Sequence, residues 1–81
     1  MVPRATAQVV VVNPNNIFIV FDAGLEDGVV PNSIVSILRD GRRVGKAMAS
    51  KVRDRVSAAV ILPEWRTQDT IQVGDVVSLA E

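Results

Sequence analysis

The sequence lacks the side chains on which most enzymes and metal sites depend. It contains no cysteine, no histidine and no tyrosine among its 81 residues. The absence of cysteine excludes disulfides and thiolate metal ligands, and the absence of histidine removes the usual general base and the commonest transition-metal ligand. A Ser–Lys pair with Lys46 or Lys51 would need a desolvated lysine, and both lysines lie in the most charged part of the chain. We therefore expect no catalytic residue, no metal site, no cofactor and no enzymatic activity.

Long apolar runs and aromatic side chains are also scarce. No run approaches the ~18 residues that a transmembrane helix needs, and the valine run at residues 9–12 is too short for a signal peptide. The only aromatic residues are Phe18, Phe21 and Trp65. An aliphatic core suits a tight barrel filled by its own side chains, so no small-molecule substrate is expected. The sequence thus predicts no transmembrane segment and no signal peptide, and leaves the localisation unknown.

Valine and isoleucine dominate the composition. Sixteen valines and six isoleucines favour packed strands over helices, because β-branched side chains fit a pleated surface. Turn residues divide the chain at short, regular intervals. We expect one all-β domain over residues 1–81, a small barrel that is closed or partly open, with excision from a longer protein left open. The six expected strands cover residues 5–12, 17–22, 33–39, 42–53, 56–62 and 76–80.

The strongest turn signal is Asp40-Gly41, which predicts a hairpin projecting at residues 38–44. Gly45 indicates a bulge or bend in the second arm. The net charge is zero, yet cations concentrate between residues 39 and 55. This hairpin is either a solvated tip that prevents edge-to-edge aggregation or a docking surface for an anionic partner. Its candidate partner-binding residues are Arg39, Arg42, Arg43 and Lys46.

Two further features have both a structural and a functional interpretation. The loop DAGLEDG at residues 22–28 lacks the alternating oxygen ligands of a calcium site, so a structural turn is favoured. Its negative charge is nonetheless complementary to the basic hairpin, which would allow a head-to-tail contact between copies. Trp65 is a further candidate partner-binding residue, because tryptophan is enriched at interface hot spots. A cap that closes one end of the barrel is the favoured alternative for Trp65.

The chain contains one internal echo. VVPNSIVSI at residues 29–37 resembles IQVGDVVSL at residues 71–79, with Asn32 in the place of Gly74 and Ser33 in the place of Asp75. Asparagine is the residue besides glycine that best tolerates a left-handed backbone. The echo indicates either a pseudo-symmetric barrel or two strands that converged on similar turns.

Several expected strands are apolar at consecutive positions. QVVVV, IFIVF and SAAVIL do not alternate between apolar and polar residues, as a half-exposed sheet should. We therefore expect the outer face of at least one strand to be covered. The candidate covers are the 63–73 loop with Trp65, a second copy of the chain, or other parts of a longer protein.

The run FDAGLEDGVVPNSIVSILRDGRRVGKAMASKVRDRVSAAVI, followed by IQVGDVV, resembles a small β-barrel module of bacterial envelope proteins. Similar patterns occur in the C-terminal domain of the flagellar assembly protein T and in the β-domains of the rod-shape-determining protein C family. The resemblance covers about residues 15–78. It implies a closed barrel built around the hairpin of residues 33–53 and a non-catalytic role in assembling or anchoring an envelope structure, which suggests the periplasm or cell envelope. The matched positions are turn glycines and core valines, so the resemblance transfers no functional residue.

These observations predict a non-enzymatic interaction module, a terminal domain of a bacterial envelope protein that acts in assembly. Its partner would be a second copy or another envelope protein. The alternative is a barrel that binds nucleic acid or another anionic polymer through the basic hairpin. Nucleic acid is disfavoured because no aromatic residue for base stacking lies between Ile34 and Leu62.

Overall fold

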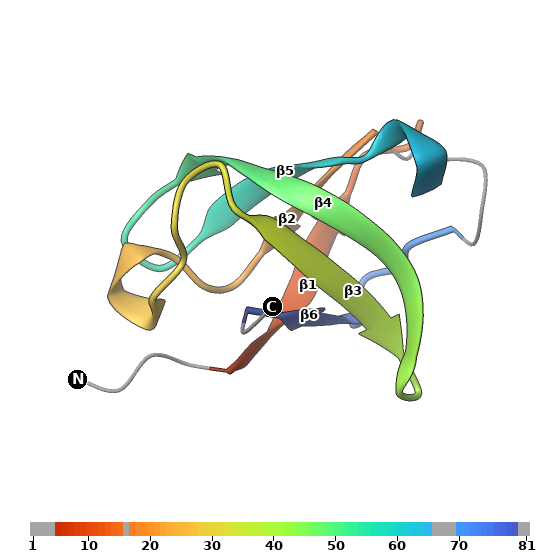
Figure 1. The fold of residues 1–81 in the computed structure, drawn as a ribbon, viewed down its shortest axis with the longest axis horizontal. Helices are drawn as coiled ribbons and strands as arrows, with labels where there is room; N and C mark the ends of the chain where they lie inside the picture. The colour runs from red at the N-terminus through yellow and green to blue at the C-terminus, as the bar shows by residue number, and fades with distance from the viewer. Residues whose placement is uncertain (1–4, 16, 66–69, 80–81) are drawn as a thin grey trace.

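The chain forms a closed antiparallel barrel of six strands (Figure 1). The computed structural model describes residues 5–15, 17–65 and 70–79. The strands close in the order β1-β2-β5-β4-β3-β6, so every strand pairs on both sides. The elements are β1 (Thr6–Val12), β2 (Phe18–Phe21), the 3-10 turn η1 (Leu25–Asp27), β3 (Ile34–Arg39), β4 (Arg42–Val52), β5 (Ser57–Ile61), the 3-10 turn η2 (Pro63–Trp65) and β6 (Val76–Ser78).

The prediction of an all-β fold with six strands is confirmed, and the barrel is closed. Residue 80 of the last predicted strand and residues 66–69 of the predicted 63–73 loop lie outside the described residues. None of the helical turns in the described part of the chain is long and apolar enough to span a membrane.

The hairpin between β3 and β4 turns at Asp40 and Gly41, as predicted. Both residues have positive φ angles, 53° and 79°, the combination that a two-residue type I′ turn requires. This turn matches the right-handed twist of the two strands, and the hairpin extends beyond the rest of the barrel (Figure 1).

Bulges explain why the apolar residues of β1 do not alternate. The β1–β2 register shifts between Val9 and Val11, so Val9 is buried while Val10 and Val11 are 43% and 49% exposed. Two consecutive side chains therefore point to the same outer face. No described segment covers this face, since Phe18 on the neighbouring strand is also 40% exposed. Cover by a second copy or by other parts of a longer protein stays a prediction, and residues 66–69 of the 63–73 loop lie outside the described residues.

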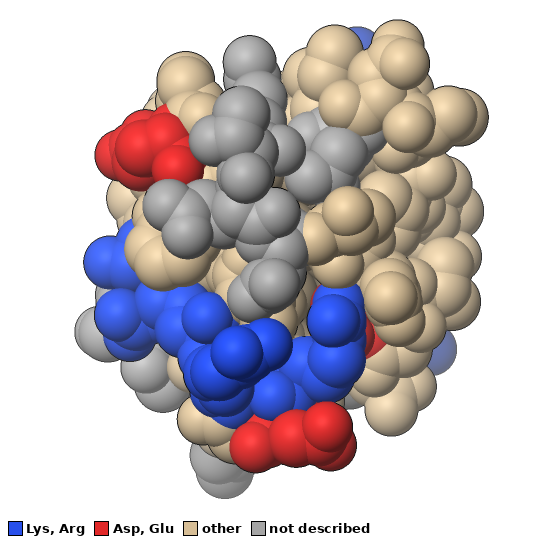
Figure 2. Space-filling model, turned by 90° about the vertical axis from the view of Figure 1, so that its right-hand side faces the viewer, with Lys and Arg blue, Asp and Glu red and all other residues tan. Residues whose placement is uncertain are grey.

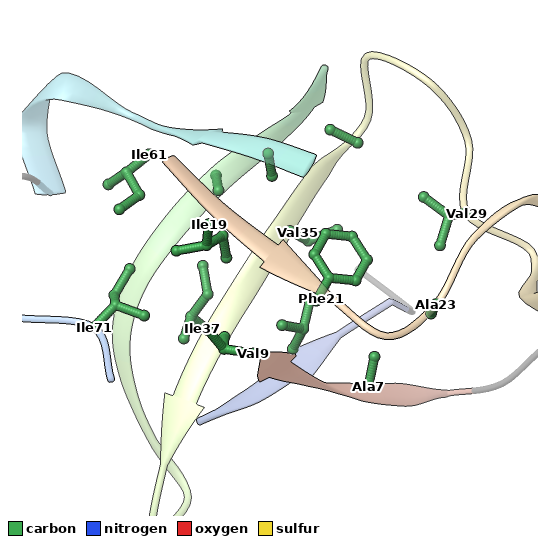
Figure 3. Packing of buried hydrophobic residues seen from close by; sticks show 14 of the residues in the cluster. Ala7, Val9, Ile19, Phe21, Ala23, Val29, Val35, Ile37, Ile61 and Ile71 are labelled. Carbon is green, nitrogen blue, oxygen red and sulfur yellow. The ribbon is translucent and has the colours of Figure 1, made fainter. Parts of the chain in front are cut away.

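The barrel interior is filled with aliphatic side chains around one aromatic ring (Figure 3). Phe21, Ile19, Ile37 and Ile61 are fully buried there. Ile71, from the segment before β6, closes the packing beside Gly45, whose hypothetical Cβ would lie 2.9 Å from the Ile71 Cδ1. Glycine at this position therefore makes room for a core side chain.

The second half of the chain repeats the first. β1 pairs with β2 in the same pattern as β4 pairs with β5, and the bulge at Val10 corresponds to a bulge at Ser50. β1 also pairs with β6 as β4 pairs with β3: Thr6 lies opposite Ser78, and Lys46 lies opposite Ser36. The pairs Val20–Ala58 and Ser36–Ser78 map onto themselves under this equivalence. The barrel is therefore pseudo-two-fold symmetric.

The turns before β3 and β6 repeat in the same way. Asn32 and Gly74 both have positive φ angles, 69° and 96°. The Asn32 and Gly74 amides donate to Ala49 and Val9, each over 2.8 Å. The two strands did not merely converge on similar turns, because their partners on β4 and β1 also correspond. The pseudo-symmetric interpretation of the echo is confirmed.

Candidate interaction site on the outer face of strand β4

Arg39, the first of the predicted partner-binding residues, forms an ion pair within the barrel. Its guanidinium group donates from Nε to Asp75 Oδ1 over 2.9 Å and from Nη2 to Asp75 Oδ2 over 2.8 Å. A further bond from Nη2 to the Thr70 carbonyl measures 2.7 Å. This bidentate arrangement is the strong form of an arginine–carboxylate pair. Arg39 therefore ties β3 to the segment before β6.

The environment of Asp75 lowers the pKa of its carboxyl group. Burial alone would raise this pKa, since Asp75 is only 5% exposed. The hydrogen bond from Arg39, the bond from the Gln72 amide and the positive charge of Arg39 together outweigh burial and hold the pKa below its usual value. Asp75 is thus ionised whenever the ion pair is formed.

The bulge at Val44 brings Arg43 and Lys46 to the same side of β4. Ile37 pairs with Gly45 and Leu38 with Arg43, so Val44 is the extra residue. Val44 and Gly45 are both buried, whereas Arg43 is exposed and Lys46 half-buried. Residues three apart on a regular strand would point to opposite faces, and the bulge places both cations on the outer face.

The bulge at Ser50 has the same effect at the other end of β4. Ser50 is the extra residue between Ala49 and Lys51, and both Ser50 and Lys51 are exposed. Arg53, which follows the strand, is exposed as well. We define the basic face as the four cations that the two bulges bring to the outer side of β4: Arg43, Lys46, Lys51 and Arg53.

No carboxylate within the described residues forms an ion pair with a member of the basic face; the two pairs found there are Arg39–Asp75 and Arg55–Glu26. Arg42 is exposed at the hairpin end, opposite Arg39 in the ladder. Figure 2 shows a band of Lys and Arg side chains on the side of the molecule that carries the hairpin. Of the predicted residues, Arg43 and Lys46 therefore share the outer face of β4. Arg42 pairs with Arg39 and alternates with Arg43 along the strand, and Arg39 is bound to Asp75.

An apolar row crosses the basic face. Met48 lies between Lys46 and Lys51 on β4 and is 36% exposed. It pairs with Val60 on one side and with Ile34 on the other, and Val60 pairs in turn with Phe18. We define the apolar row as these four cross-strand neighbours: Ile34, Met48, Val60 and Phe18. Its members are half-buried or exposed, so no described segment covers it.

The equivalent strand β1 shows that the fold does not require these cations. β1 makes the same register and the same bulge as β4, yet Thr6 stands in the place of Lys46 and Val11 in the place of Lys51. Gln8 stands in the place of Met48. A requirement of the barrel itself would apply to both strands, so the basic face is a property of the surface and not of the fold.

The carboxylates of the acidic loop, residues 22–28, interact with other groups of the same chain. Glu26 pairs with Arg55 over 3.5 Å, and the Asp27 carboxylate accepts a hydrogen bond from the Gly24 amide over 2.9 Å. The Leu25 amide donates to the Arg53 carbonyl over 2.7 Å. The loop thus acts as a structural turn against the β4–β5 connection, as expected.

Trp65 ends η2 and packs half-buried against the core cluster. Its amide donates to the Leu62 carbonyl over 2.9 Å. This position agrees with a cap on the barrel, and a partner contact by Trp65 stays a prediction.

Sequence reasoning missed Lys51 and Arg53 as members of the same surface. Their spacing from Lys46 places them on different faces of a regular strand, and a bulge at Ser50 has no glycine to indicate it. The one available signal was the comparison with β1, where the equivalent valines also fail to alternate.

No pocket is found among the described residues. No protein-family model matches the sequence, and no curated protein matches it.

Proposed function

We propose that this protein is a non-enzymatic interaction module that contributes to assembly by docking a second copy or another protein on the outer face of β4, β5 and β2. One observation carries the proposal: the apolar row is half-buried or exposed, and the cations of the basic face beside it form no ion pair with another described residue. An apolar centre with a charged border is the usual anatomy of a protein–protein interface. Exposed apolar patches of this kind mark interaction sites more often than isolated surface valines do.

The cellular setting is part of the same proposal. The resemblance to β-domains of bacterial envelope proteins favours a role in building or anchoring an envelope structure. In this role the apolar row supplies burial, at roughly 25 cal/mol per Å² of apolar surface. The cations set orientation and the rate of encounter more than affinity.

Light scattering after gel filtration, at about 50 mM and about 500 mM salt, separates the two kinds of partner. A defined oligomer at both salt concentrations, converted to monomer by Phe18→Ser, would identify the partner as a second copy. An oligomer at low salt alone would indicate that charges drive the contact. A monomer at both concentrations would contradict self-association and leave a different protein as the partner.

A photo-reactive amino acid placed at Met48 tests whether this face is an interface at all. The matched control is the same amino acid at Gln8, the equivalent position on β1. In the cell that produces the protein, we expect a defined cross-linked product from position 48 and none from position 8. Equal products from both positions, or none from either, would contradict the proposal.

A further inference from the structure

We propose that the partner of the basic face is an extended acidic polypeptide segment with apolar side chains at its centre and carboxylates on either side. This inference rests on the proposed function and narrows it to one class of partner. It depends on the order of side chains along the outer side of β4 and the residue that follows it, where two cations of the basic face precede Met48 and two come after it.

The spacing along β4 fits an extended chain. Successive outward side chains on a strand are about 7 Å apart, as are alternate side chains of an extended peptide. Arg43 and Lys46 occupy successive outward positions, and the bulge at Ser50 restores the same phase for Lys51. In a peptide lying along this strand, every second side chain would face β4, and each of these would lie opposite one outward side chain of the strand.

The apolar row distinguishes a polypeptide from a uniform polyanion. Met48 lies in the middle of the basic face, with Val60 and Ile34 beside it. A nucleic acid carries charge at every repeat, so it would place a phosphate over this apolar centre. No aromatic side chain lies on β3, β4, β5 or β6 in the described part of the chain. Phe18, the aromatic residue of the apolar row, lies on β2 and is separated from β4 by β5. Base stacking beside the cations of β4 therefore has no platform.

A second copy is a poor source of the carboxylates. Within the acidic loop, Glu26 already pairs with Arg55, and Asp27 accepts from the Gly24 amide. The Asp22 carboxylate accepts a hydrogen bond from the backbone amide of Gln8 over 2.7 Å. These contacts engage the carboxylates of the loop within their own barrel, and the exposed Asp40, Asp54 and Glu64 are separated along the chain and form no acidic segment. The inference therefore assigns the acidic segment to a different protein.

Fluorescence anisotropy with three labelled probes tests the inference on the full chain. The first probe is a short synthetic peptide with glutamates on either side of a central Val-Leu-Val, and the second has the same glutamates around a central Gly-Ser-Gly. The third is oligodeoxythymidylate. We expect the chain to bind the first probe most tightly. Met48→Gln, which copies the equivalent residue of β1, should abolish the preference for the first probe over the second.

The cations are tested by a pair of variants matched in charge. Lys46→Thr/Lys51→Val copies the residues of β1, and Thr6→Glu/Val11→Glu lowers the net charge by the same amount on the opposite strand. We expect the first variant to weaken binding of the apolar-centred peptide about tenfold, since two exposed ion pairs are lost. The second should change it less than about twofold. Circular dichroism checks that both variants keep the strand content of the parent.

Four results would overturn the inference. These are equal weakening by the two matched variants, equal binding of the two peptides, tighter binding of oligodeoxythymidylate than of either peptide, and no binding of any probe. If cross-linking at Met48 persists in any of these cases, the face is still an interface and only the identity of its partner is wrong. If that cross-linking also fails, the proposed function fails with it.

Discussion

The two halves of this barrel share a backbone frame and differ in the surface they present. β1 and β4 pair with equivalent neighbours and bulge at equivalent residues, Val10 and Ser50. Their outward side chains have nonetheless diverged, with Val11 on one strand and Lys51 on the other. The difference teaches that ladder hydrogen bonds and inward side chains fix the frame, whereas outward positions are free to take on a binding role.

The interior differs between the halves in a complementary way. Phe21 on β2 lies opposite Ser57 on β5, and Ile19 lies opposite Ala59. Each large side chain of the first half thus faces a small one of the second. Two large side chains at each of these positions would overfill a barrel of this size. The Ser57 hydroxyl, buried by this packing, donates to the Ala23 carbonyl over 2.7 Å.

The largest loss of stability on substitution is expected at Gly24, in a loop that differs between the two halves. Gly24 and Leu62 are equivalent, since each carbonyl accepts the amide that ends its 3-10 turn. A Cβ at Gly24 would lie 2.1 Å from the Arg53 carbonyl oxygen. We expect Gly24→Ala to lower the free energy of unfolding by about 3 kcal/mol, because backbone must move to relieve the clash. Urea denaturation followed by circular dichroism measures the loss.

Gly41→Ala is the control for this steric effect. Gly41 has a φ of 79° but nothing within 4 Å of a hypothetical Cβ, so only backbone strain of about 1 kcal/mol is expected. Equal losses for the two variants would show that the close contact at Gly24 is not what limits substitution.

The next largest loss of stability is expected for substitutions in the turns that precede β3 and β6. Asp75 carries the buried pair with Arg39, whereas the equivalent Ser33 makes a single side-chain bond to the Val30 carbonyl. Asp75→Ala should therefore lower the free energy of unfolding by about 2–3 kcal/mol, and Ser33→Ala by about 1 kcal/mol or less. The same urea measurement compares the two variants. A larger loss for Ser33→Ala than for Asp75→Ala would contradict the stabilising role assigned to the ion pair.

The contribution of Asp75 should depend on pH in one direction. Its pKa is lower in the folded than in the unfolded chain, so the ion pair stabilises fully above the unfolded value near 3.8. This contribution is lost as the pH falls through the folded-state pKa. In urea denaturation at a series of pH values, the difference between the parent and Asp75→Ala should shrink in acid. A difference that stays constant there would contradict the lowered pKa.

The smallest effect is expected for the cations themselves. Lys46→Thr/Lys51→Val gives β4 the outward residues that β1 already carries at the same register. We expect the free energy of unfolding to change by less than about 0.5 kcal/mol, as for most surface substitutions. A loss above about 1 kcal/mol in urea would show that the basic face supports the fold and would remove the argument for a binding role.

The sequence by itself determined the local elements of this protein. Valine-rich runs and turn residues predicted the six strands, the Asp40-Gly41 turn and the left-handed backbone at Asn32, because each depends on side chains a few residues apart. The echo between residues 29–37 and 71–79 even indicated the pseudo-symmetry.

Only the tertiary structure decided which side chains share a surface. A bulge forms between two paired strands, and a shift of one residue sends every following side chain to the other face. Lys46 and Lys51 therefore join one face only once β4 has paired with β3 and β5. Arg39 was expected at the binding surface, yet closure of the barrel brings it to Asp75, far away in the sequence. Contacts that depend on barrel closure bring together residues distant in the chain, and a local pattern cannot encode them.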